Sequence, residues 1–400
     1  MMNPNECKSI NSPLFKRLPK KCFLSDYWQQ KPYFFEGVLA DDMPVLSQVI
    51  NGNALAGMAC EPEVESRLIF GYEHHADWYC EYGGEGEDSN AFDEERFAQL
   101  PENNWTLLVQ GVDQWYEEAY QLLSYFDFLP QWRLEDIMAS YAPVGGGVGP
   151  HFDYYDVFLI QVSGERQWKL GQQCDENSPL KKGSEVKLLH DFYEEVTYNA
   201  KVGDVLYIPA GKAHWGTASS DDCITLSVGF RAPSQKELLE KVLENLLDHC
   251  TDNQRYQDPK NTQDDVPHSS KITSSMYQNV EKMLQHLTPE VIEMSARQAF
   301  GMLVTEPRYP ALDHDDEDVS NWHRLINDHF HTEGSIEFDI PVSTRIAFSA
   351  SHLFVNAHCY TVQESFSQSL SEACIPVSII GEEEKRIIIE LLENGDITLS

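Results

Sequence analysis

The chain has 400 residues, and its 42% hydrophobic and 24% charged residues are typical of a soluble globular protein. This length predicts two or three domains rather than one. The formal net charge of −36 disfavours DNA, RNA and anionic membranes as partners and favours basic proteins or peptides, although such acidity also serves solubility alone.

Two further features concern the cellular compartment. The N-terminus carries lysines and an arginine but no apolar segment of a secretory signal, and no apolar run approaches the roughly 20 residues of a membrane helix. The nine cysteines are scattered, odd in number and without a C-x-x-C pair, which indicates reduced thiols rather than a disulfide framework. We therefore expect a cytoplasmic protein without a membrane segment.

The N-terminal third predicts a polar leader over 1–22 and then short elements that pack around a larger domain. Helices are predicted from Ser25-Asp26 to Pro32, over 45–58 and over 113–128. Strands are predicted over 65–70 and 105–112, with an acidic loop over 81–88 between them.

Strands dominate residues 132–231, where Gly, Pro and Asp separate apolar segments. In the first segment Asp136, Met138 and Ser140 alternate on one face. The segments that follow have the same alternation, and they are Phe158 to Val162, Arg166 to Leu170 after a turn at 163–165, and Cys223 to Gly229. These strands predict a β-barrel.

Three residues of this region form a candidate metal site. His151 and Asp153 lie at i and i+2, so on a strand their side chains point to the same side. The strand that ends at Pro209 would deliver His214 after a short turn. Two imidazoles and one carboxylate on one face of an ion are the ligand set of non-haem Fe(II) oxygenases. An H-x-D pair with a distant histidine also occurs by chance, so the flanking residues decide.

Those flanks contain two motifs. Glycines fill 145–147 and 149, and G-D-x(4)-P-x-G-x(2)-H leads into His214. This pairing resembles the two motifs of the double-stranded β-helix, or cupin, and more narrowly those of the Jumonji-C 2-oxoglutarate oxygenases. In such sites the keto acid chelates the metal through two positions and leaves one for dioxygen.

The distal carboxylate of a keto acid bound in this way needs a buried cation, and Arg166 is the best candidate. It shares a strand face with Trp168 and Leu170, and an unpaired buried charge is costly, so an inward arginine needs an anionic partner. A carboxylate fits the guanidinium fork. The alternative partner is a protein carboxylate, and Lys212 and Arg231 are weaker candidates for the same role.

Same-face alternation also predicts the rest of the pocket. Asp136 and Ser140 would project into the barrel, Tyr155 would line its mouth beside Asp153, and Ser227 would face inward. Asp136 is a candidate receptor for a cationic substrate side chain, with Tyr155 as a flat wall. Its alternative role is a structural hydrogen bond.

Beyond Pro233 the pattern changes to helices over 236–250, 276–287 and 289–304, with a polar linker over 251–271. This helical module would either mediate dimerisation or pack only within the chain.

Residues 307–400 mix strands with two helices, over 365–373 and 382–394, in a winged-helix-like pattern. The strands are predicted over 335–339, 345–349, 353–355 and 359–362. Acidic residues outnumber basic ones there, which argues against DNA binding. We interpret His329-x-His331, which mimics a metal motif, as an exposed loop.

At these residues the chain resembles the bacterial ribosomal oxygenases, Jumonji-C enzymes that hydroxylate an arginine of a large-subunit ribosomal protein. The likeness covers at least Tyr27 to Pro233 and includes the runs DYWQQKP, NWTLLVQGVDQW, GGGVGPHFDYYDVFLIQ and LSVGFRAP. The resemblance implies a site made of three groups of residues: Fe(II) at His151, Asp153 and His214, 2-oxoglutarate at Ser140 and Arg166, and the substrate arginine near Asp136, Tyr155 and Ser227.

The resemblance also implies an α+β protein of three parts. These are a double-stranded β-helix (cupin, Jumonji-C) catalytic domain with N-terminal helices over 1–234, a helical dimerisation module over 235–306 and a winged-helix-like domain over 307–400. The implied reaction consumes O2 and 2-oxoglutarate, hydroxylates an arginine of ribosomal protein sixteen and yields succinate and CO2. The implied partners are a basic ribosomal protein and a second copy of the chain, without nucleic acid or membrane. Alternatives are a histidyl hydroxylase or lysyl demethylase acting on another protein, or a non-catalytic cupin scaffold.

Overall fold

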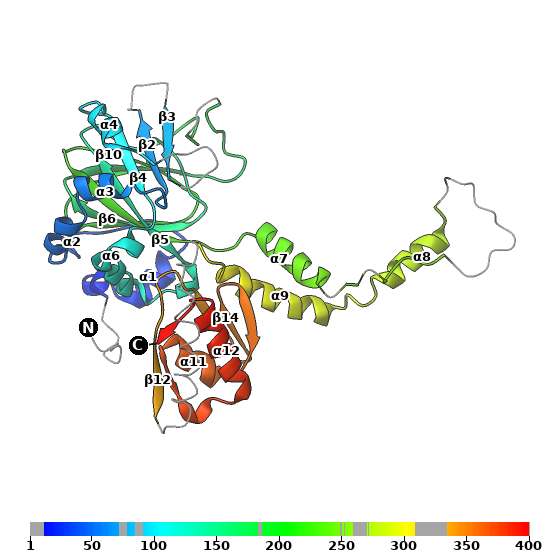
Figure 1. The fold of residues 1–400 in the computed structure, drawn as a ribbon. Coiled ribbons are helices and arrows are strands. Elements are labelled where there is room, and N and C mark those ends of the chain that lie inside the picture. Colours follow the sequence, from blue (N-terminus) through cyan, green and yellow to red (C-terminus); the bar gives the residue numbers. More distant parts are fainter. Residues whose placement is uncertain are drawn as a thin grey trace. The chain divides into compact units, whose positions relative to one another are not determined.

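The computed structural model (Figure 1) describes residues 12–71, 78–84, 91–182, 186–248, 250–251, 253–258, 270, 272–308 and 334–399. Residues 1–11 of the predicted leader and the His329-x-His331 motif lie outside the described residues. Packing divides the chain into two compact units, residues 1–232 and 233–400. No helix in the described ranges is both long enough and apolar enough to cross a membrane.

The first unit is built on two antiparallel sheets. The major sheet has eight strands in the order β1 (Tyr33–Phe35), β9 (Val205–Ile208), β6 (Asp156–Ser163), β11 (Cys223–Phe230), β5 (Leu134–Ala142), β4 (Trp105–Val109), β2 (Ser66–Phe70) and β3 (Tyr79–Gly83). The minor sheet has the order β10 (Lys212–Ala218), β7 (Arg166–Gln173) and β8 (Val196–Ala200). Two facing sheets of this kind are what the predicted double-stranded β-helix requires.

Strand alternation explains which side chains reach the space between the sheets. On β6, Phe158 and Ile160 pack in the core under the N-terminal helices, whereas Val157 and Leu159 pack toward the minor sheet. Both faces of β6 are covered, and this is why its sequence is almost continuously apolar. On β5, Ile137 and Ala139 join the same core under the N-terminal helices, so Asp136 and Ser140 point into the cavity on the other face, as predicted.

The helices of the first unit correct several predicted boundaries. They are α1 (Lys20–Asp26), α2 (Met43–Val49), α3 (Gly52–Met58), α4 (Glu94–Ala98), α5 (Val112–Trp115) and α6 (Glu117–Leu122), with 3-10 turns η2 (Pro13–Lys16), η3 (Leu123–Phe126) and η4 (Gln131–Arg133). The predicted helix from Ser25 to Pro32 is wrong, because α1 begins after Pro19 and ends at Asp26. The Ser25 hydroxyl bonds to the carbonyl of Cys22 instead of capping a helix.

Two other predicted elements differ for local reasons. The pattern over 45–58 forms two helices, because the Asn51 side chain accepts a hydrogen bond from the Ala54 N–H and so caps α3. The acidic loop predicted from residue 81 includes the end of β3, which pairs with β2. The strand over 66–70 is confirmed.

The second unit contains α7 (Gln235–Leu247), α8 (Ser274–Met283) and α9 (Pro289–Val304), followed by two small sheets and two helices. The sheets are β16 (Cys374–Pro376), β12 (Ser335–Asp339) and β17 (Thr398–Leu399), and β13 (Ile346–Phe348), β14 (His352–Val355) and β15 (His358–Thr361). Helices α11 (Glu364–Ser371) and α12 (Glu382–Glu393), and the turn η5 (Val377–Ile379), complete it. A Ser234–Glu237 capping box begins α7, and Thr288 with Pro289 begins α9.

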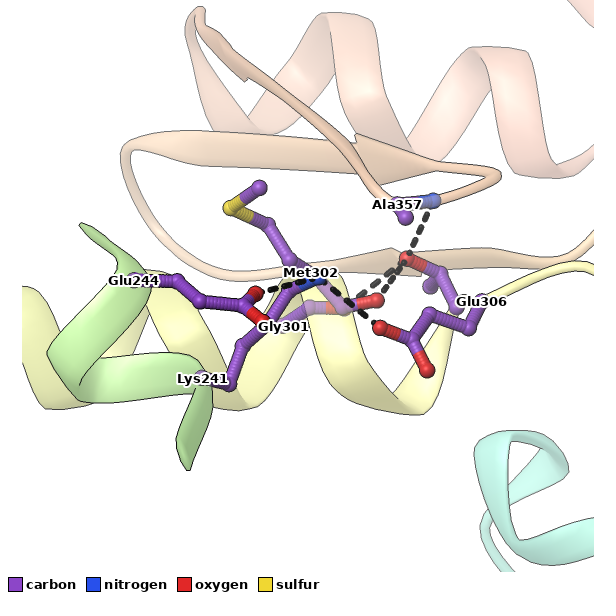
Figure 2. A network of polar contacts seen from close by, with 7 residues as sticks. Lys241, Glu244, Gly301, Met302, Glu306 and Ala357 are labelled. Atoms are coloured by element: carbon purple, nitrogen blue, oxygen red, sulfur yellow. Dashed lines mark hydrogen bonds and ion pairs between the residues drawn. The ribbon is translucent and has the colours of Figure 1, made fainter. Parts of the chain in front are cut away.

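Polar contacts join the helices of the second unit to its sheets (Figure 2). The Lys241 Nζ of α7 lies 2.9 Å from the Glu306 Oε1 that follows α9. The Thr305 hydroxyl donates to the Gly301 carbonyl at 2.8 Å and accepts from the Ala357 N–H, in the β14–β15 turn, at 3.2 Å. The first contact ties α7 to the end of α9, and the second ties the end of α9 to the sheet of β13, β14 and β15. A further domain boundary near residue 306 stays a prediction.

Candidate metal centre and active site

A cavity of about 510 Å³ lies between the two sheets of the first unit. Every residue that the sequence analysis assigned to the site lines it: His151, Asp153, His214, Ser140, Arg166, Asp136, Tyr155 and Ser227. A second cavity, of about 570 Å³, lies beside Asn51, Trp105 and Tyr141, and none of the assigned residues lines it. The structure thus brings the predicted residues together at one place.

The predicted metal ligands face one another. The Nε2 atoms of His151 and His214 lie 3.9 Å and 3.5 Å from the Asp153 Oδ2. The three ligand atoms all lie within 4.8 Å of one another, and no other group of His, Cys, Asp or Glu in the described part of the chain has this geometry. Two imidazoles and a carboxylate so placed can bind one divalent ion on a single face.

The two histidines are fixed by a pair of backbone hydrogen bonds. The His151 N–H donates to the His214 carbonyl at 3.0 Å, and the His214 N–H donates to the His151 carbonyl at 2.8 Å. The prediction that His151 and Asp153 share a regular strand is wrong. His151 forms only an isolated bridge with His214, and Asp153 lies outside any strand. The Asp153 carbonyl accepts a further backbone hydrogen bond from the Gly211 N–H at 2.7 Å.

His214 follows a short turn after β9, as predicted. It lies inside β10, which belongs to the minor sheet, whereas β9 belongs to the major sheet. The connection from β9 to β10 therefore crosses from one sheet to the other. His214 comes from the minor sheet, and His151 and Asp153 come from the segment that precedes β6.

Hydrogen bonds at the far ring nitrogens define the histidine tautomers. The Nδ1 atoms of His151 and His214 lie 2.9 Å and 3.0 Å from the carbonyls of Gly149 and Lys212. A carbonyl can only accept, so each Nδ1 carries the proton and each Nε2 presents its lone pair toward Asp153. Burial and the neighbouring His151 lower the pKa of His214 to about 4, so its imidazole is neutral at physiological pH.

The glycine run before His151 has a steric cause. At Gly147 a Cβ atom would lie 2.3 Å from the Gly216 carbonyl oxygen of β10. Gly147 also bridges to Thr217, so the run continues the pairing that holds His151 against His214. Only glycine permits this approach of the two backbones.

Arg166 is buried at the end of the cavity, with 3% of its surface exposed. Its Nε donates to the Cys223 Sγ at 3.4 Å, and its Nη2 is buried without a hydrogen-bond partner in the structure. No carboxylate in the described residues forms an ion pair with it, so the alternative of a protein partner is not met. Lys212 pairs with Glu195 at 2.5 Å and Arg231 is exposed, and neither lines the cavity.

At the other side of the cavity, Asp136 accepts a hydrogen bond from the Gly111 N–H at 3.1 Å. With its amide oriented to satisfy both neighbours, Gln110 donates to Asp136 at 3.1 Å and accepts from the Arg67 Nη2 at 3.3 Å. Burial, Asp153 and Asp136 raise the pKa of Tyr155 well above its usual range, so its phenol keeps the proton. The bond from Gly111 is the structural hydrogen bond considered for Asp136, and the Asp136 carboxylate also lines the cavity.

Arg67, Gln110 and Cys223 were not predicted from the sequence. Arg67 alternates with Ile69 on β2, and both line the cavity, so the alternation within RLIF was an available signal. Gln110 follows β4 directly. The contact of Cys223 with Arg166 had no local signal, because the two residues lie on different strands far apart in sequence.

Comparisons with known proteins agree with this geometry. Residues 121–238 match the family model of the JmjC domain. A "Probable ribosomal oxygenase" of Haemophilus influenzae is 34% identical over 317 residues, which are 76% of this chain and 73% of that protein. The "Ribosomal protein uL16 3-hydroxylase" of Escherichia coli is 34% identical over 293 residues, 72% of this chain and 71% of that protein.

Solved structures give the same result. An X-ray structure of Escherichia coli YcfD has a TM-score of 0.72 at 25% identity and covers 96% of this chain and 99% of its own. YcfD, described as a ribosomal oxygenase in complex with cobalt and 2-oxoglutarate, has a TM-score of 0.67 at 26% identity, over 95% and 98% of the two chains. The present chain therefore belongs to the ribosomal oxygenase family of JmjC-domain proteins.

Proposed function

We propose that this protein is an Fe(II)- and 2-oxoglutarate-dependent dioxygenase that hydroxylates an arginine side chain of a large-subunit ribosomal protein. One observation carries the proposal: the His151, Asp153 and His214 ligand set and the unpartnered Nη2 of Arg166 face the same cavity. An Escherichia coli relative named for hydroxylation of ribosomal protein uL16 supports the substrate class.

The three ligand residues would hold Fe(II), whose chemistry with O2 and 2-oxoglutarate supplies the oxidant and yields succinate and CO2. Arg166 would bind the distal carboxylate of 2-oxoglutarate, because a buried guanidinium without an anionic partner is costly and a carboxylate satisfies it. Ser140 lines the cavity with its hydroxyl donating to the Thr225 carbonyl at 3.3 Å, and would contribute a further polar contact. The Trp168 ring centroid lies 5.6 Å from the Arg166 Cζ, and this indole would shield the bound carboxylate from water.

Asp136, Tyr155 and Ser227 would receive the substrate side chain. A guanidinium needs a carboxylate to pair with, and Asp136 offers one that Gly111 and Gln110 already orient. The protonated phenol of Tyr155 and the hydroxyl of Ser227 line the same part of the cavity. The net charge of −36 favours capture of a basic ribosomal protein and disfavours direct contact with nucleic acid.

The second unit would provide a dimer interface. Helix α7 exposes Leu239, Leu243 and Leu247 by 54%, 58% and 65%, and these residues form one stripe at i, i+4 and i+8. Such an apolar stripe supports a homodimer through the helical module over 235–306. We propose a winged-helix-like fold for residues 307–400 and a cytoplasmic location for the enzyme.

Incubation with Fe(II), 2-oxoglutarate and total ribosomal proteins tests the function. We expect mass spectrometry to find one added oxygen atom on an arginine of one large-subunit protein, and none with His214→Ala. The absence of an added oxygen on every ribosomal protein would contradict the substrate assignment. Two relatives named as bifunctional lysine-specific demethylases and histidyl hydroxylases match only 20% and 42% of this chain. Formaldehyde release from methylated lysine peptides would identify a demethylase.

A further inference from the structure

Alternate residues of β11 lead from the cavity lining to the side chain of Arg166. Gly229 and Ser227 line the cavity, and two residues further on the Thr225 hydroxyl donates to the Gln161 Oε1 at 2.9 Å. Cys223 comes next on this face and is fully buried, packed with Ala142 and Ala218. The thiol therefore lies behind the cavity lining, beside Arg166.

Two nitrogen donors converge on the Cys223 sulfur. The Arg166 Nε lies 3.4 Å and the Gln161 Nε2 3.3 Å from the Sγ. A 180° flip of the Gln161 amide would break hydrogen bonds, because its Oε1 accepts from the Thr225 hydroxyl and its Nε2 also donates to the Ser163 carbonyl at 2.7 Å. Gln161 is 1% exposed, so water cannot replace these bonds.

The bond from Nε to sulfur determines which part of the guanidinium remains for a ligand. A carboxylate can approach a guanidinium along the edge that includes Nε or along the two terminal nitrogens. Cys223 occupies the Nε hydrogen, while the Nη2 is buried and without a partner. We propose that Cys223, oriented by Gln161, is a positioning residue that presents the terminal nitrogens of Arg166 to the distal carboxylate of 2-oxoglutarate; this rests on the proposed role of Arg166.

The chemistry of a thiol suits this position. A carboxylate in place of the sulfur would neutralise Arg166 and compete with the cosubstrate for it. A thiol is a weak acceptor, so it orients the guanidinium and leaves the positive charge uncompensated. Cys223 is therefore expected to affect the affinity for 2-oxoglutarate more than the affinity for the metal.

Calorimetric binding of 2-oxoglutarate to the Co(II)-loaded protein tests this role without turnover. We expect Cys223→Ala and Cys223→Val to weaken binding by about three- to tenfold, which is the range for the loss of one hydrogen bond. Cys223→Ser keeps an acceptor and should restore most of the affinity. Pyruvate shares the keto acid head but has no distal carboxylate, so its affinity should be the same in all the variants.

Two controls separate the possible failures. Cys174→Ala removes a buried thiol that does not line the cavity and should leave both affinities unchanged. If Arg166→Ala leaves 2-oxoglutarate binding intact, the proposed cosubstrate site itself is wrong. If Arg166→Ala weakens binding but neither Cys223→Ala nor Cys223→Val does, or if these two weaken pyruvate equally, the positioning role is overturned. Thermal melting of each variant, with Cys223→Val filling the space that alanine leaves, separates loss of folding from loss of orientation.

Discussion

Arg133 and Asp156 form a buried ion pair, in which the Arg133 Nη2 lies 2.9 Å from the Asp156 Oδ2 and the side chains are 9% and 1% exposed. The Tyr207 hydroxyl donates to the other carboxylate oxygen at 2.6 Å and accepts from the Gln29 N–H at 2.7 Å. These contacts thus join η4 and the turn after α1 to β6 and β9. Asp156 is the first residue of β6 and follows Tyr155 directly, so the same contacts fix the backbone next to Tyr155, which lines the cavity.

Asp156→Asn should lower the free energy of unfolding by about 3 kcal/mol, because it leaves the buried Arg133 charge without a counter-charge. Denaturant unfolding followed by tryptophan fluorescence measures this. Glu36→Gln breaks the Arg17–Glu36 pair, whose side chains are 65% and 75% exposed, and should change stability by less than about 0.5 kcal/mol. Equal losses in the two variants would show that burial does not govern these pairs.

The candidate site was predictable because strand alternation is local. Strand alternation placed Asp136 and Ser140, at i and i+4, on one face of β5, and it placed Arg166 on the same face of β7 as Trp168. Contacts between residues of different sheets were not predictable. The pairing of His151 with His214 depends on a crossing between sheets, and the contact of Cys223 with Arg166 depends on the closure of the barrel.

The helix boundaries failed for a different reason. Local signals compete, and packing decides among them. Pro19 precedes α1, and Phe23 of that helix is fully buried against aromatic side chains of the core, so the helix forms before the Ser25-Asp26 pair that the sequence suggested as its cap. Within 45–58 the apolar spacing is helical throughout, but Asn51 satisfies the N-terminus of α3 and separates the two helices.

Gly147→Ala should destabilise the protein and weaken metal binding, because the added Cβ would lie 2.3 Å from the Gly216 carbonyl oxygen. The strain acts on the backbone pair that holds His151 against His214. Gly57→Ala is the matched control, since it lies inside α3 with nothing within 4 Å of the new Cβ, and it should stabilise by about 0.5–1 kcal/mol. Thermal melting with and without Co(II) gives both effects, and an unchanged melting temperature for Gly147→Ala would refute the steric argument.

His214→Ala should reduce the affinity for Co(II) by more than about 100-fold, because it removes one of three ligands and leaves a ligand pair. Metal content after dialysis, measured by elemental mass spectrometry, reports the loss. His190→Ala is the control: its ring pairs with Asp191 at 3.0 Å, is 64% exposed and does not line the cavity. Retention of the metal by His214→Ala would place the ion elsewhere.

Asp136→Asn should raise the KM for the basic peptide substrate by about 10- to 100-fold, because a hydrogen bond between two charged groups becomes one to a neutral amide. The KM for 2-oxoglutarate should stay the same, since Arg166 and the metal ligands are untouched. The asparagine can still accept from the Gly111 N–H, so the fold is preserved. Glu165→Gln, half-exposed and outside the cavity, serves as the charge-matched control. A parallel rise in both KM values would assign Asp136 to the structure rather than to the substrate.

Leu243→Glu should convert the proposed homodimer into a monomer, because it places a charge at the centre of the exposed leucine stripe of α7. Size-exclusion chromatography with light scattering gives the mass directly. Val45→Glu makes the same kind of change at another exposed apolar residue, 61% exposed on α2, and should leave the mass unchanged. A monomeric parent protein would remove the dimer from the proposal. A dimeric Leu243→Glu variant would instead move the interface away from α7, to the exposed Ile292 and Met294 of α9.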